Sequence, residues 1–327
     1  MTARAVVVHA FGEPESFSLE ERDPGHPGPG KIRMKVHAAG VSFVDVLVAE
    51  GKYQLQPPLP FVPGSEFAGV IEAVGEGVDP ARIGQRVCGS GFGAAVAEAA
   101  VIPAKLALPI PDAMSFEQAS VFRVSYATAY HALVQRARLK AGEVLCVLGA
   151  AGAVGYASIQ IGKALGATVI ASASTKEKRD FALSGGADHA IDSNADDWRA
   201  QVKEASGGHG LDVVIDPLGD RFTEPAFRSL AWNGRHLVIG FAAGQIPKLP
   251  TNLALLKGAS LIGVDIRQLG IFEPEMSEAN IPALFDLYTA GHLRPPVASI
   301  YPLDRFADAM HEAKAGQSAG RVVIRMH

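Results

Sequence analysis

A cluster of three glycines within residues 149–155 constrains this chain more than any other feature of its sequence. The apolar run Val144–Leu148 before it is typical of a buried strand, and an amphipathic pattern over 156–165 follows it. Strand, glycine-rich turn and helix form the first half of a βαβ unit that binds dinucleotides. Small residues are needed there because a pyrophosphate must approach bare backbone and meet the amide groups at the helix start. The turn residues that we expect to contact such a cofactor are Gly149, Gly152, Ala153, Val154 and Gly155.

The second strand of this unit predicts which dinucleotide is bound. Residues 167–173 are again apolar, and an Asp or Glu near the end of this strand normally binds the ribose 2′-hydroxyl of NAD. Here the strand ends in Ala173, and hydroxyls and cations follow, among them Ser174 and Lys178. Since a carboxylate would repel a 2′-phosphate and a cation attracts it, we expect NADPH, contacted by Ser174 and Lys178. The alternative is a helix cap at Ser174 or Thr175, and both roles are compatible.

Length and charge indicate an enzyme of two lobes. The chain has 327 residues, more than a usual single domain, and a formal net charge of −4. This balance gives no reason to expect a nucleic-acid or membrane partner, and no apolar run reaches the roughly 18 residues of a membrane span. The two cysteines, Cys88 and Cys146, are far apart and lie beside apolar residues. We therefore expect reduced, structural thiols and a cytoplasmic protein.

The organisation of the chain changes near residue 120. Short β-like runs separated by Gly and Pro turns precede that point and indicate a β-barrel-like lobe, with strands near 4–8, 32–36, 67–74, 86–89 and 95–102. A helical pattern covers 116–139, and strands then alternate with helices, near 144–148, 168–172, 188–191, 212–216, 235–239 and 260–264. Such alternation predicts the α/β class with a doubly wound parallel sheet.

The last part of the chain returns to a mixed pattern. Two helical segments at 281–289 and 304–315 precede a final strand at 321–325. We therefore expect residues 1–123 and 268–327 to form a catalytic domain. Residues 124–267 are expected to form the dinucleotide-binding domain.

Six motifs spread along the chain are similar to those of one known family. They are GVSFVD at 40–45, PFVPGSEFAGVIEAVG at 60–75, GQRV at 84–87, ATAYHAL at 127–133, AAGAVG at 150–155 and GGADHAID at 185–192. On these motifs the chain resembles the medium-chain dehydrogenase/reductase superfamily, specifically its zinc-free quinone oxidoreductase (zeta-crystallin-like) branch. The resemblance implies a GroES-like catalytic domain, a Rossmann domain and an active site between them. It also implies a homodimer paired through edge strands near 235–264.

Departures from the zinc-dependent relatives point to the chemistry. Those relatives carry Cys, His and Cys where this chain has Ser42, Ser65 and, approximately, Val124. Because Zn²⁺ needs three or four N, S or O ligands, these positions do not supply a zinc site. A quinone or an α,β-unsaturated carbonyl accepts hydride without a metal, so we expect a metal-independent NADPH:quinone reductase.

The resemblance also implies individual site residues. Tyr53 matches a tyrosine that faces substrate and nicotinamide, which makes it the candidate proton or hydrogen-bond donor, and Thr128 would approach the nicotinamide amide. The other cofactor contacts implied in this way are Phe43, Asp45, Phe241, Ala242, Ala243 and Lys314. Arg123 stands where the family often has proline, and Ser193 where it has a tyrosine near the adenosine phosphate.

Each of these residues also has a structural interpretation. Asp45 has the spacing to form a capping box with Ser42. The alternative for Tyr53 is packing on the adjacent proline-rich loop. For Phe241 the alternative is a place in the core, and for Lys314 it is the end of a solvated helix. At the level of function, an enal, enone or enoyl-thioester reductase is the alternative enzyme. A non-catalytic, crystallin-like NADPH-binding protein is the alternative outside catalysis.

Overall fold

Two units with separate hydrophobic cores make up the chain. The computed structural model describes residues 2–54, 56–91 and 93–327. Unit 1 comprises residues 1–124 and 295–327, and unit 2 comprises residues 125–294. No helix in the described part of the chain combines the length and the apolar character needed to cross a bilayer.

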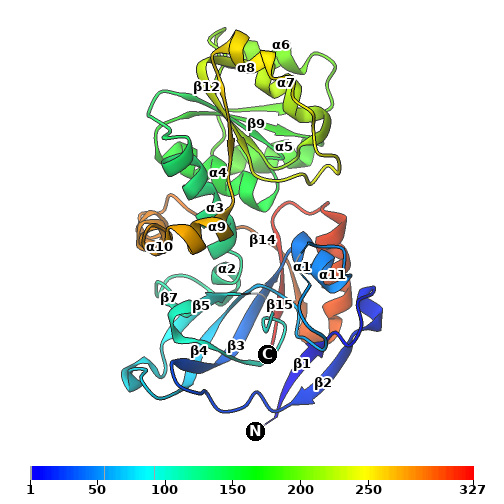
Figure 1. Ribbon diagram of the computed structural model, residues 1–327, viewed down its shortest axis with the longest axis vertical. Coiled ribbons are helices and arrows are strands. Elements are labelled where there is room, and N and C mark those ends of the chain that lie inside the picture. Colours follow the sequence, from blue (N-terminus) through cyan, green and yellow to red (C-terminus); the bar gives the residue numbers. More distant parts are fainter. Residues whose placement is uncertain (1, 55, 92) are drawn as a thin grey trace. The chain divides into compact units, whose positions relative to one another are not determined.

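Unit 1 is dominated by antiparallel strands (Figure 1). Strands β1 (Ala3–Val7) and β2 (Ser18–Arg22) form a two-stranded sheet. The larger sheet has the order β14-β15-β3-β4-β5-β7, with β6 also paired to β3. Its members are β3 (Lys31–Val41), β4 (Glu66–Val74), β5 (Arg86–Ser90), β6 (Ala99–Pro103), β7 (Leu108–Pro109), β14 (Val297–Pro302) and β15 (Arg321–Arg325). Helices α1 (Phe43–Ala49), α2 (Phe116–Ala119) and α11 (Phe306–Ala315) complete the unit.

Strand β3 shows why this sheet forms. Its side chains alternate between buried and half-buried, and Ile32, Met34 and Val36 are fully buried in the core. This period of two is that of a strand with one face in the core, and the strand was expected near 32–36. The last strand, β15, lies antiparallel to β3 with Val323 opposite Gly40, so the chain's end belongs to the sheet of unit 1.

Unit 2 contains six parallel strands in the order β10-β9-β8-β11-β12-β13. The strands are β8 (Val144–Leu148), β9 (Thr168–Ala173), β10 (His189–Asp192), β11 (Leu211–Asp216), β12 (Leu230–Val238) and β13 (Ser260–Gly263). The helices are α3 (Arg123–Tyr130), which begins in unit 1, α4 (Ala153–Ala164), α5 (Lys176–Ser184), α6 (Trp198–Ala205), α7 (Thr223–Arg228), α8 (Asn252–Lys257), α9 (Ile266–Phe272) and α10 (Pro274–Thr289).

The strand order of unit 2 is that of a doubly wound dinucleotide-binding fold. Every residue of β8 is buried, as expected for the central strand of a parallel sheet with helices on both faces (Figure 1). The predicted α/β class is therefore confirmed. In folds of this kind, ligands bind at the edge of the sheet where the parallel strands end.

Two expectations differ from the structure. Helices α9 and α10 belong to unit 2, so the second boundary lies at 295 and not at 268. Asn280 of α10 is buried and exchanges hydrogen bonds with Gln135 at 2.7 and 3.3 Å, which holds α10 to the segment after α3. The helical stretch expected at 116–139 is interrupted between α2 and α3, and it continues as a π-helical segment over His131–Arg136.

Candidate functional site

The glycine turn after β8 exposes bare backbone. Gly149 has φ +59°, a left-handed conformation that favours glycine, and a Cβ on Gly155 would lie 2.4 Å from the carbonyl oxygen of Gly149. Gly152 is the N-cap of α4 and offers no side chain to the first-turn amides. These amides are left for an acceptor from elsewhere, and an anion is the natural one at a helix N-terminus.

The end of β9 lies next along the sheet edge. Ala173 is buried, and Thr175 caps α5 by accepting the backbone N–H of Lys178 at 3.2 Å. Of the two alternative caps, Thr175 is therefore the one used, and Ser174 is exposed. Lys178 is half-buried in the first turn of α5. The geometry leaves a hydroxyl and a nearby cation where a dinucleotide-binding unit specific for NAD carries a carboxylate.

Arg179 is a further cation at this point, which the sequence showed only as part of a charged run. Its guanidinium donates to the carbonyl oxygen of Ala173 at 3.2 Å and pairs with Asp192 at 3.1 Å. Arg179 thus links the ends of β9 and β10. Its bond to Ala173 also holds the backbone at the end of β9.

The loop that contains Phe241, Ala242 and Ala243 is joined to the loop after β11. Ala242 N–H donates to Pro217 O and Ala243 N–H to Leu218 O, both at 3.0 Å. Leu218 in turn packs closely on Gly149 of the glycine turn. The loop after β11 thus lies between the glycine turn and the 241–243 segment, and it connects these two expected cofactor segments. A Cβ on Gly149 would lie 3.0 Å from Leu218 Cδ2. Phe241 is 40% exposed, so the alternative of a core residue is not supported.

A buried network under these loops was missed by the sequence reasoning. Asp216, at the end of β11, accepts the backbone N–H groups of Leu218 and Gly219 at 3.0 and 2.8 Å. It also accepts the hydroxyl of Thr223 at 2.6 Å, and His236 Nε2 lies 2.9 Å from the same oxygen. The available signal was an Asp followed by Pro-Leu-Gly, and a histidine inside an apolar strand.

Thr128 lies buried on α3, the helix that also takes part in a second polar network. The hydroxyl of Tyr126 on α3 donates to Gln160 Oε1 on α4 at 2.7 Å, and Arg294 N–H donates to the same oxygen at 3.0 Å. α3 is thereby anchored to the helix that follows the glycine turn. Thr128 is fixed on the same helix as the anchoring Tyr126.

In unit 1, a small hollow gathers several residues of the first two family-like motifs. Its volume is about 30 Å³, enough for one or two water molecules, and its lining includes Val44, Asp45, Val48, Gly64 and Ser65. It lies at the start of α1 and at the segment preceding β4. Of the side chains just named, the polar ones are the hydroxyl of Ser65 and the carboxylate of Asp45.

The expected residues at the start of α1 have clear structural roles. Asp45 Oδ2 accepts the N–H and the hydroxyl of Ser42 at 2.8 and 2.6 Å, and Asp45 N–H donates to Ser42 Oγ at 3.1 Å. This capping box confirms the structural interpretation of Asp45, which is 5% exposed. Phe43 is 42% exposed at the helix start. Tyr53 is partly exposed in the segment after α1, and no hydrogen bond of its hydroxyl is seen within the described residues.

The three positions of zinc ligands in related enzymes have other functions here. The backbone N–H of Val124 donates to Glu66 Oε1 at 2.7 Å, and Ser65 lines the hollow described above. Ser42 belongs to the capping box. The described residues contain no group of three or more His, Cys, Asp or Glu placed to hold a metal. Burial raises the pKa of the Cys88 thiol to about 12, so a thiolate ligand is disfavoured there too.

Lys314 is occupied by carboxylates of its own unit. Its ammonium pairs with Glu13 at 3.0 Å and with buried Glu50, whose hydrogen bond raises the pKa of Lys314. The expected phosphate contact by Lys314 is therefore not supported, because the charge is already balanced.

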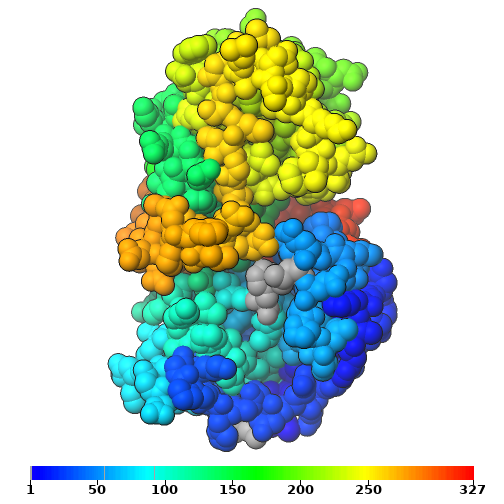
Figure 2. All heavy atoms as spheres, viewed as in Figure 1, coloured from blue at the N-terminus to red at the C-terminus, as the bar shows by residue number. Residues whose placement is uncertain are grey.

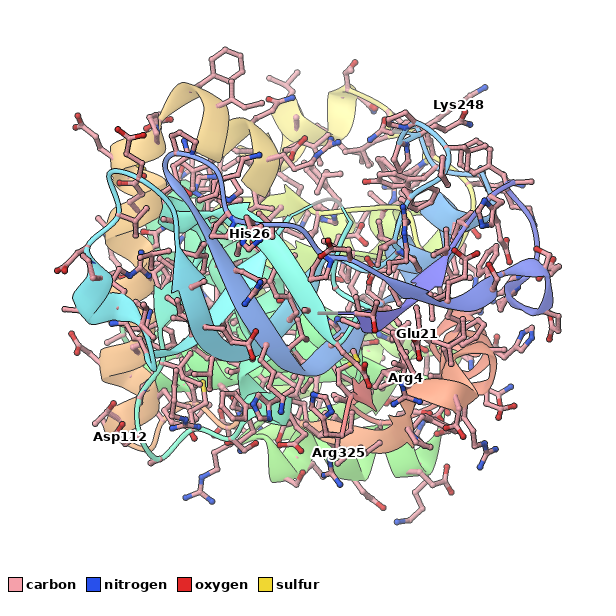
Figure 3. The ribbon with its side chains drawn as sticks, turned by 90° about the horizontal axis from the view of Figure 1, so that it is seen from below. Arg4, Glu21, His26, Asp112, Lys248 and Arg325 are labelled. Carbon is pink, nitrogen blue, oxygen red and sulfur yellow. The ribbon has the colours of Figure 1, made fainter. Side chains whose placement is uncertain are left out.

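Arg123, which had no explanation from the sequence, helps to hold a segment of unit 1. It donates to the carbonyl oxygen of Leu106 at 3.0 Å. Arg82 donates to Ala104 O at 2.9 Å, and Arg86 donates to Asp112 O at 2.8 Å. Asp112 is labelled in Figure 3. Three arginines thus satisfy carbonyl groups along one stretch that has little regular structure.

A larger groove, of about 700 Å³, lies on unit 2 outside all the expected cofactor residues. Its charged lining comprises Arg199, Asp220, Arg221, Glu224, Arg228 and Lys248. Lys248 extends outward at the edge of the view in Figure 3. Glu224 neutralises Arg228 through an ion pair at 2.7 Å, and Arg221 donates to Asn194.

Comparisons with known proteins agree with this architecture. Residues 28–112 match the alcohol dehydrogenase GroES-like domain family, and residues 153–283 match the zinc-binding dehydrogenase family. A quinone oxidoreductase-like protein 2 homolog from Nematostella vectensis is 34% identical, over 98% of this chain and 88% of its own length. Quinone oxidoreductase from Rattus norvegicus is also 34% identical, over 94% of this chain and 93% of its own length. A solved mycobacterial structure in complex with NADPH is 30% identical, with a TM-score of 0.88, covering 99% of this chain and 100% of that one.

The sheet order, the glycine turn and these matches define a two-domain dehydrogenase/reductase of the medium-chain class. Within that superfamily, the chain belongs to the quinone oxidoreductase-like proteins.

Proposed function

We propose that this protein is an NADPH-dependent oxidoreductase that reduces a quinone or a related conjugated carbonyl without a metal. The observation that carries the proposal is the bare glycine turn, in which the main chain leaves no room for a side chain on Gly155. The lack of zinc donors at Ser42, Ser65 and Val124 limits the chemistry to acceptors that need no Lewis acid. The family relationship and the NADPH complex of a mycobacterial relative support the same class of reaction.

The residues of unit 2 fit the proposed cofactor. The first-turn amides of α4, from Ala153, Val154 and Gly155, would donate to the pyrophosphate. Ser174 and Lys178 would donate to the 2′-phosphate. When bound, NADPH would supply the hydride. Thr128, Phe241, Ala242 and Ala243 would orient the nicotinamide and exclude water from it, and Phe43 would contribute an exposed apolar surface in unit 1.

Tyr53 is the proposed donor to the reduced carbonyl. Tyr53 is partly exposed, and no hydrogen bond of its hydroxyl is seen within the described residues, so a substrate oxygen can become its acceptor. A phenol that donates a hydrogen bond or a proton to a developing oxyanion acts as a general acid. Asp45 is proposed to hold the start of α1, because its carboxylate is already used in the capping box.

A glycine substitution tests the proposal. Gly155→Ala places a methyl group against the backbone oxygen of Gly149, so the turn must open and NADPH should bind at least about tenfold more weakly, the contribution of a lost charge-assisted hydrogen bond. Gly270→Ala, on α9, is the matched control, since no atom lies closer than 4.0 Å to its new Cβ. Titration of NADPH binding by fluorescence measures both variants. Equal affinities would contradict the proposed cofactor site.

Substrate turnover separates the candidate reactions. NADPH oxidation with a panel of quinones, enals, enones and enoyl thioesters should be fastest with quinones. Fastest reduction of an enone or enoyl thioester would favour the alternative reductase. NADPH binding without oxidation in any member of the panel would favour a non-catalytic binding protein.

We further propose a cytoplasmic homodimer that pairs through the edge of the sheet in unit 2. β13 is an edge strand, and Leu261 on it is 50% exposed. Leu255 and Leu256 on neighbouring α8 are 81% and 71% exposed, and Trp232 is 74% exposed. The segment that contains α8 and β13 is coloured yellow to orange in Figure 2. An edge strand with exposed apolar residues favours pairing with a second copy. A monomeric mass in sedimentation at micromolar concentration would contradict the dimer.

A further inference from the structure

The buried pair Asp216–His236 lies directly beneath the loops that meet the glycine turn. Asp216 is 1% exposed and His236 is fully buried. Burial opposes ionisation of Asp216, but hydrogen bonds from His236, Thr223 and Gly219 outweigh it and place the pKa of this carboxyl below its usual value. Asp216 is therefore an anion with four donors, and the arrangement of those donors determines where its two oxygens point.

The two oxygens of Asp216 have different partners. Oδ1 accepts the N–H groups of Leu218 and Gly219, and so holds the loop. Oδ2 accepts from Thr223 on α7 and from His236 on β12. Because the carboxylate is rigid and planar, the donors on Oδ2 fix the position from which Oδ1 holds the loop.

The surroundings of the His236 ring determine which of its nitrogens donates a hydrogen bond. Nε2 must carry the proton, since it faces a carboxylate oxygen at 2.9 Å. Nδ1 is buried and has no hydrogen-bond partner within the described residues, so a second proton would leave an N–H group without an acceptor. The ring of Phe227 lies beside that of His236, with ring centroids 5.9 Å apart. Nε2–H is therefore the donor that this pocket uses.

The loop held by Asp216 contacts both expected cofactor segments. The side chain of Leu218 packs on Gly149, and a Cβ on Gly219 would lie 2.8 Å from the ring of Phe241. The carbonyl groups of Pro217 and Leu218 also accept the N–H groups of Ala242 and Ala243. A displacement of this loop would therefore reach the glycine turn and the 241–243 segment together.

We propose that His236 is a positioning residue of the cofactor site: through Asp216 it fixes the loop 217–219 on which the glycine turn and the 241–243 segment rest. This inference rests on the cofactor site of the proposed function. His236 touches neither cofactor nor substrate in it. Its effect is expected on the affinity for NADPH, because the loop that it fixes contacts the glycine turn and the 241–243 segment.

The test compares His236→Leu with His236→Gln. Leucine removes the donor to Asp216, whereas the glutamine side-chain amide can restore it. We expect the leucine variant to bind NADPH about 2- to 12-fold more weakly, the range of one hydrogen bond, and to raise the KM for NADPH accordingly. We expect glutamine to recover most of the affinity. His209→Leu is the matched control, because His209 forms an exposed pair with Asp212 at 3.0 Å in the same unit.

Hydrogen exchange in the free protein provides a readout that does not depend on cofactor binding. The amides of Leu218 and Gly219 should exchange faster in His236→Leu than in the unaltered protein, and slow again in His236→Gln. If His236→Leu does not fold, Thr223→Val removes the other donor to the same carboxylate oxygen and should produce the same faster exchange. Unchanged exchange at these two amides, or no recovery with glutamine, would overturn the role of His236. Failure of the unaltered protein to bind NADPH would instead refute the proposed function, and the exchange result would still decide whether His236 orders the loop.

Discussion

Arg321, on the last strand of the chain, donates from Nη2 to Glu66 Oε2 at 3.2 Å in the interior of unit 1. Their side chains are 9% and 3% exposed. Burial raises the pKa of Glu66, while the charge of Arg321 and the N–H of Val124 oppose that shift. A carboxylate next to the zinc position of related enzymes thus has a partner within the protein, and it joins β4 to β15.

Removing one partner of this pair should be costly. Arg321→Met leaves Glu66 buried without its cation, and we expect a loss of about 3–5 kcal/mol in the free energy of unfolding. Urea denaturation followed by circular dichroism measures it. Adding Glu66→Gln to Arg321→Met should recover part of the loss, because no charge then remains unpaired. Arg325→Met is the control, since Arg325 pairs with Glu117 and is 49% exposed; about 0–1 kcal/mol is expected. Equal losses for the two arginines would contradict this interpretation.

The preference for NADPH should depend on Lys178. A charge-assisted hydrogen bond contributes roughly 1.5–3 kcal/mol, so one or two contacts correspond to about a 10- to 10³-fold preference. Lys178→Ala should raise the KM for NADPH and leave that for NADH nearly unchanged, because NADH has no 2′-phosphate for Lys178 to bind. Lys176→Ala is the matched control, since Lys176 is paired with Asp180 at 2.6 Å. Steady-state kinetics with both cofactors measures this preference. Equal kcat/KM values for NADPH and NADH in the unaltered protein would contradict the predicted preference for NADPH.

The complementary change concerns the end of β9. Ala173→Asp introduces a carboxylate that repels the 2′-phosphate and can accept a ribose hydroxyl. We expect the ratio of kcat/KM for NADPH to that for NADH to fall. A ratio that stays constant would show that residue 173 does not face the ribose.

Tyr53→Phe tests the proposed donor to the substrate. Loss of a general acid lowers turnover by about 10²-fold at the low end, and by less where water supplies the proton to a quinone. We expect a modest fall in kcat, larger for enones than for quinones. Tyr130→Phe, on the Rossmann unit, serves as the control. Unaltered kcat and KM across several acceptors would exclude Tyr53 from the site.

Activity should not depend on a metal. Ser42, Ser65 and Val124 supply a capping hydroxyl, a hollow-lining hydroxyl and a backbone amide, and none of these makes a zinc ligand set. Exhaustive treatment with a chelator should leave the rate of NADPH oxidation unchanged. Loss of activity that zinc alone restores would refute the prediction.

Glu143 should contribute to stability in a pH-dependent way. Burial opposes its ionisation, but Arg235, which binds it with two hydrogen bonds at 2.9 and 2.8 Å, and the backbone of Lys140 place its pKa below the usual value. A lowered pKa in the folded state stabilises the protein above the ordinary value, about 4.3, and that contribution is lost as the pH falls through the folded pKa. After solvent screening we expect about 1 kcal/mol. In Glu143→Gln, the free energy of unfolding should fall less steeply as the pH is lowered through this acidic range. An unchanged slope would contradict the predicted role of Glu143.

The local parts of the architecture were accessible from the sequence alone. The run Val144–Leu148 and the glycines after it specify a buried strand, a tight turn and a helix, because the residue types in one short segment determine that geometry. The capping box of Ser42 and Asp45 is similarly local, since its two partners are three residues apart. The class of cofactor followed from the same short segments, through the absence of an acid at Ala173.

Only the tertiary structure could determine the contacts between distant segments. Arg321 meets Glu66 across 255 positions in the sequence, and Asn280 binds Gln135 across 145, so α10 joins unit 2 although its helical pattern gives no indication of a partner. The occupation of Lys314 by Glu13 and Glu50 is of the same kind. The sequence determined which residues are able to form strands, turns and charge pairs. The packing of the sheets determined which of them meet, because a side chain's partner depends on chain topology and burial rather than on its neighbours in sequence.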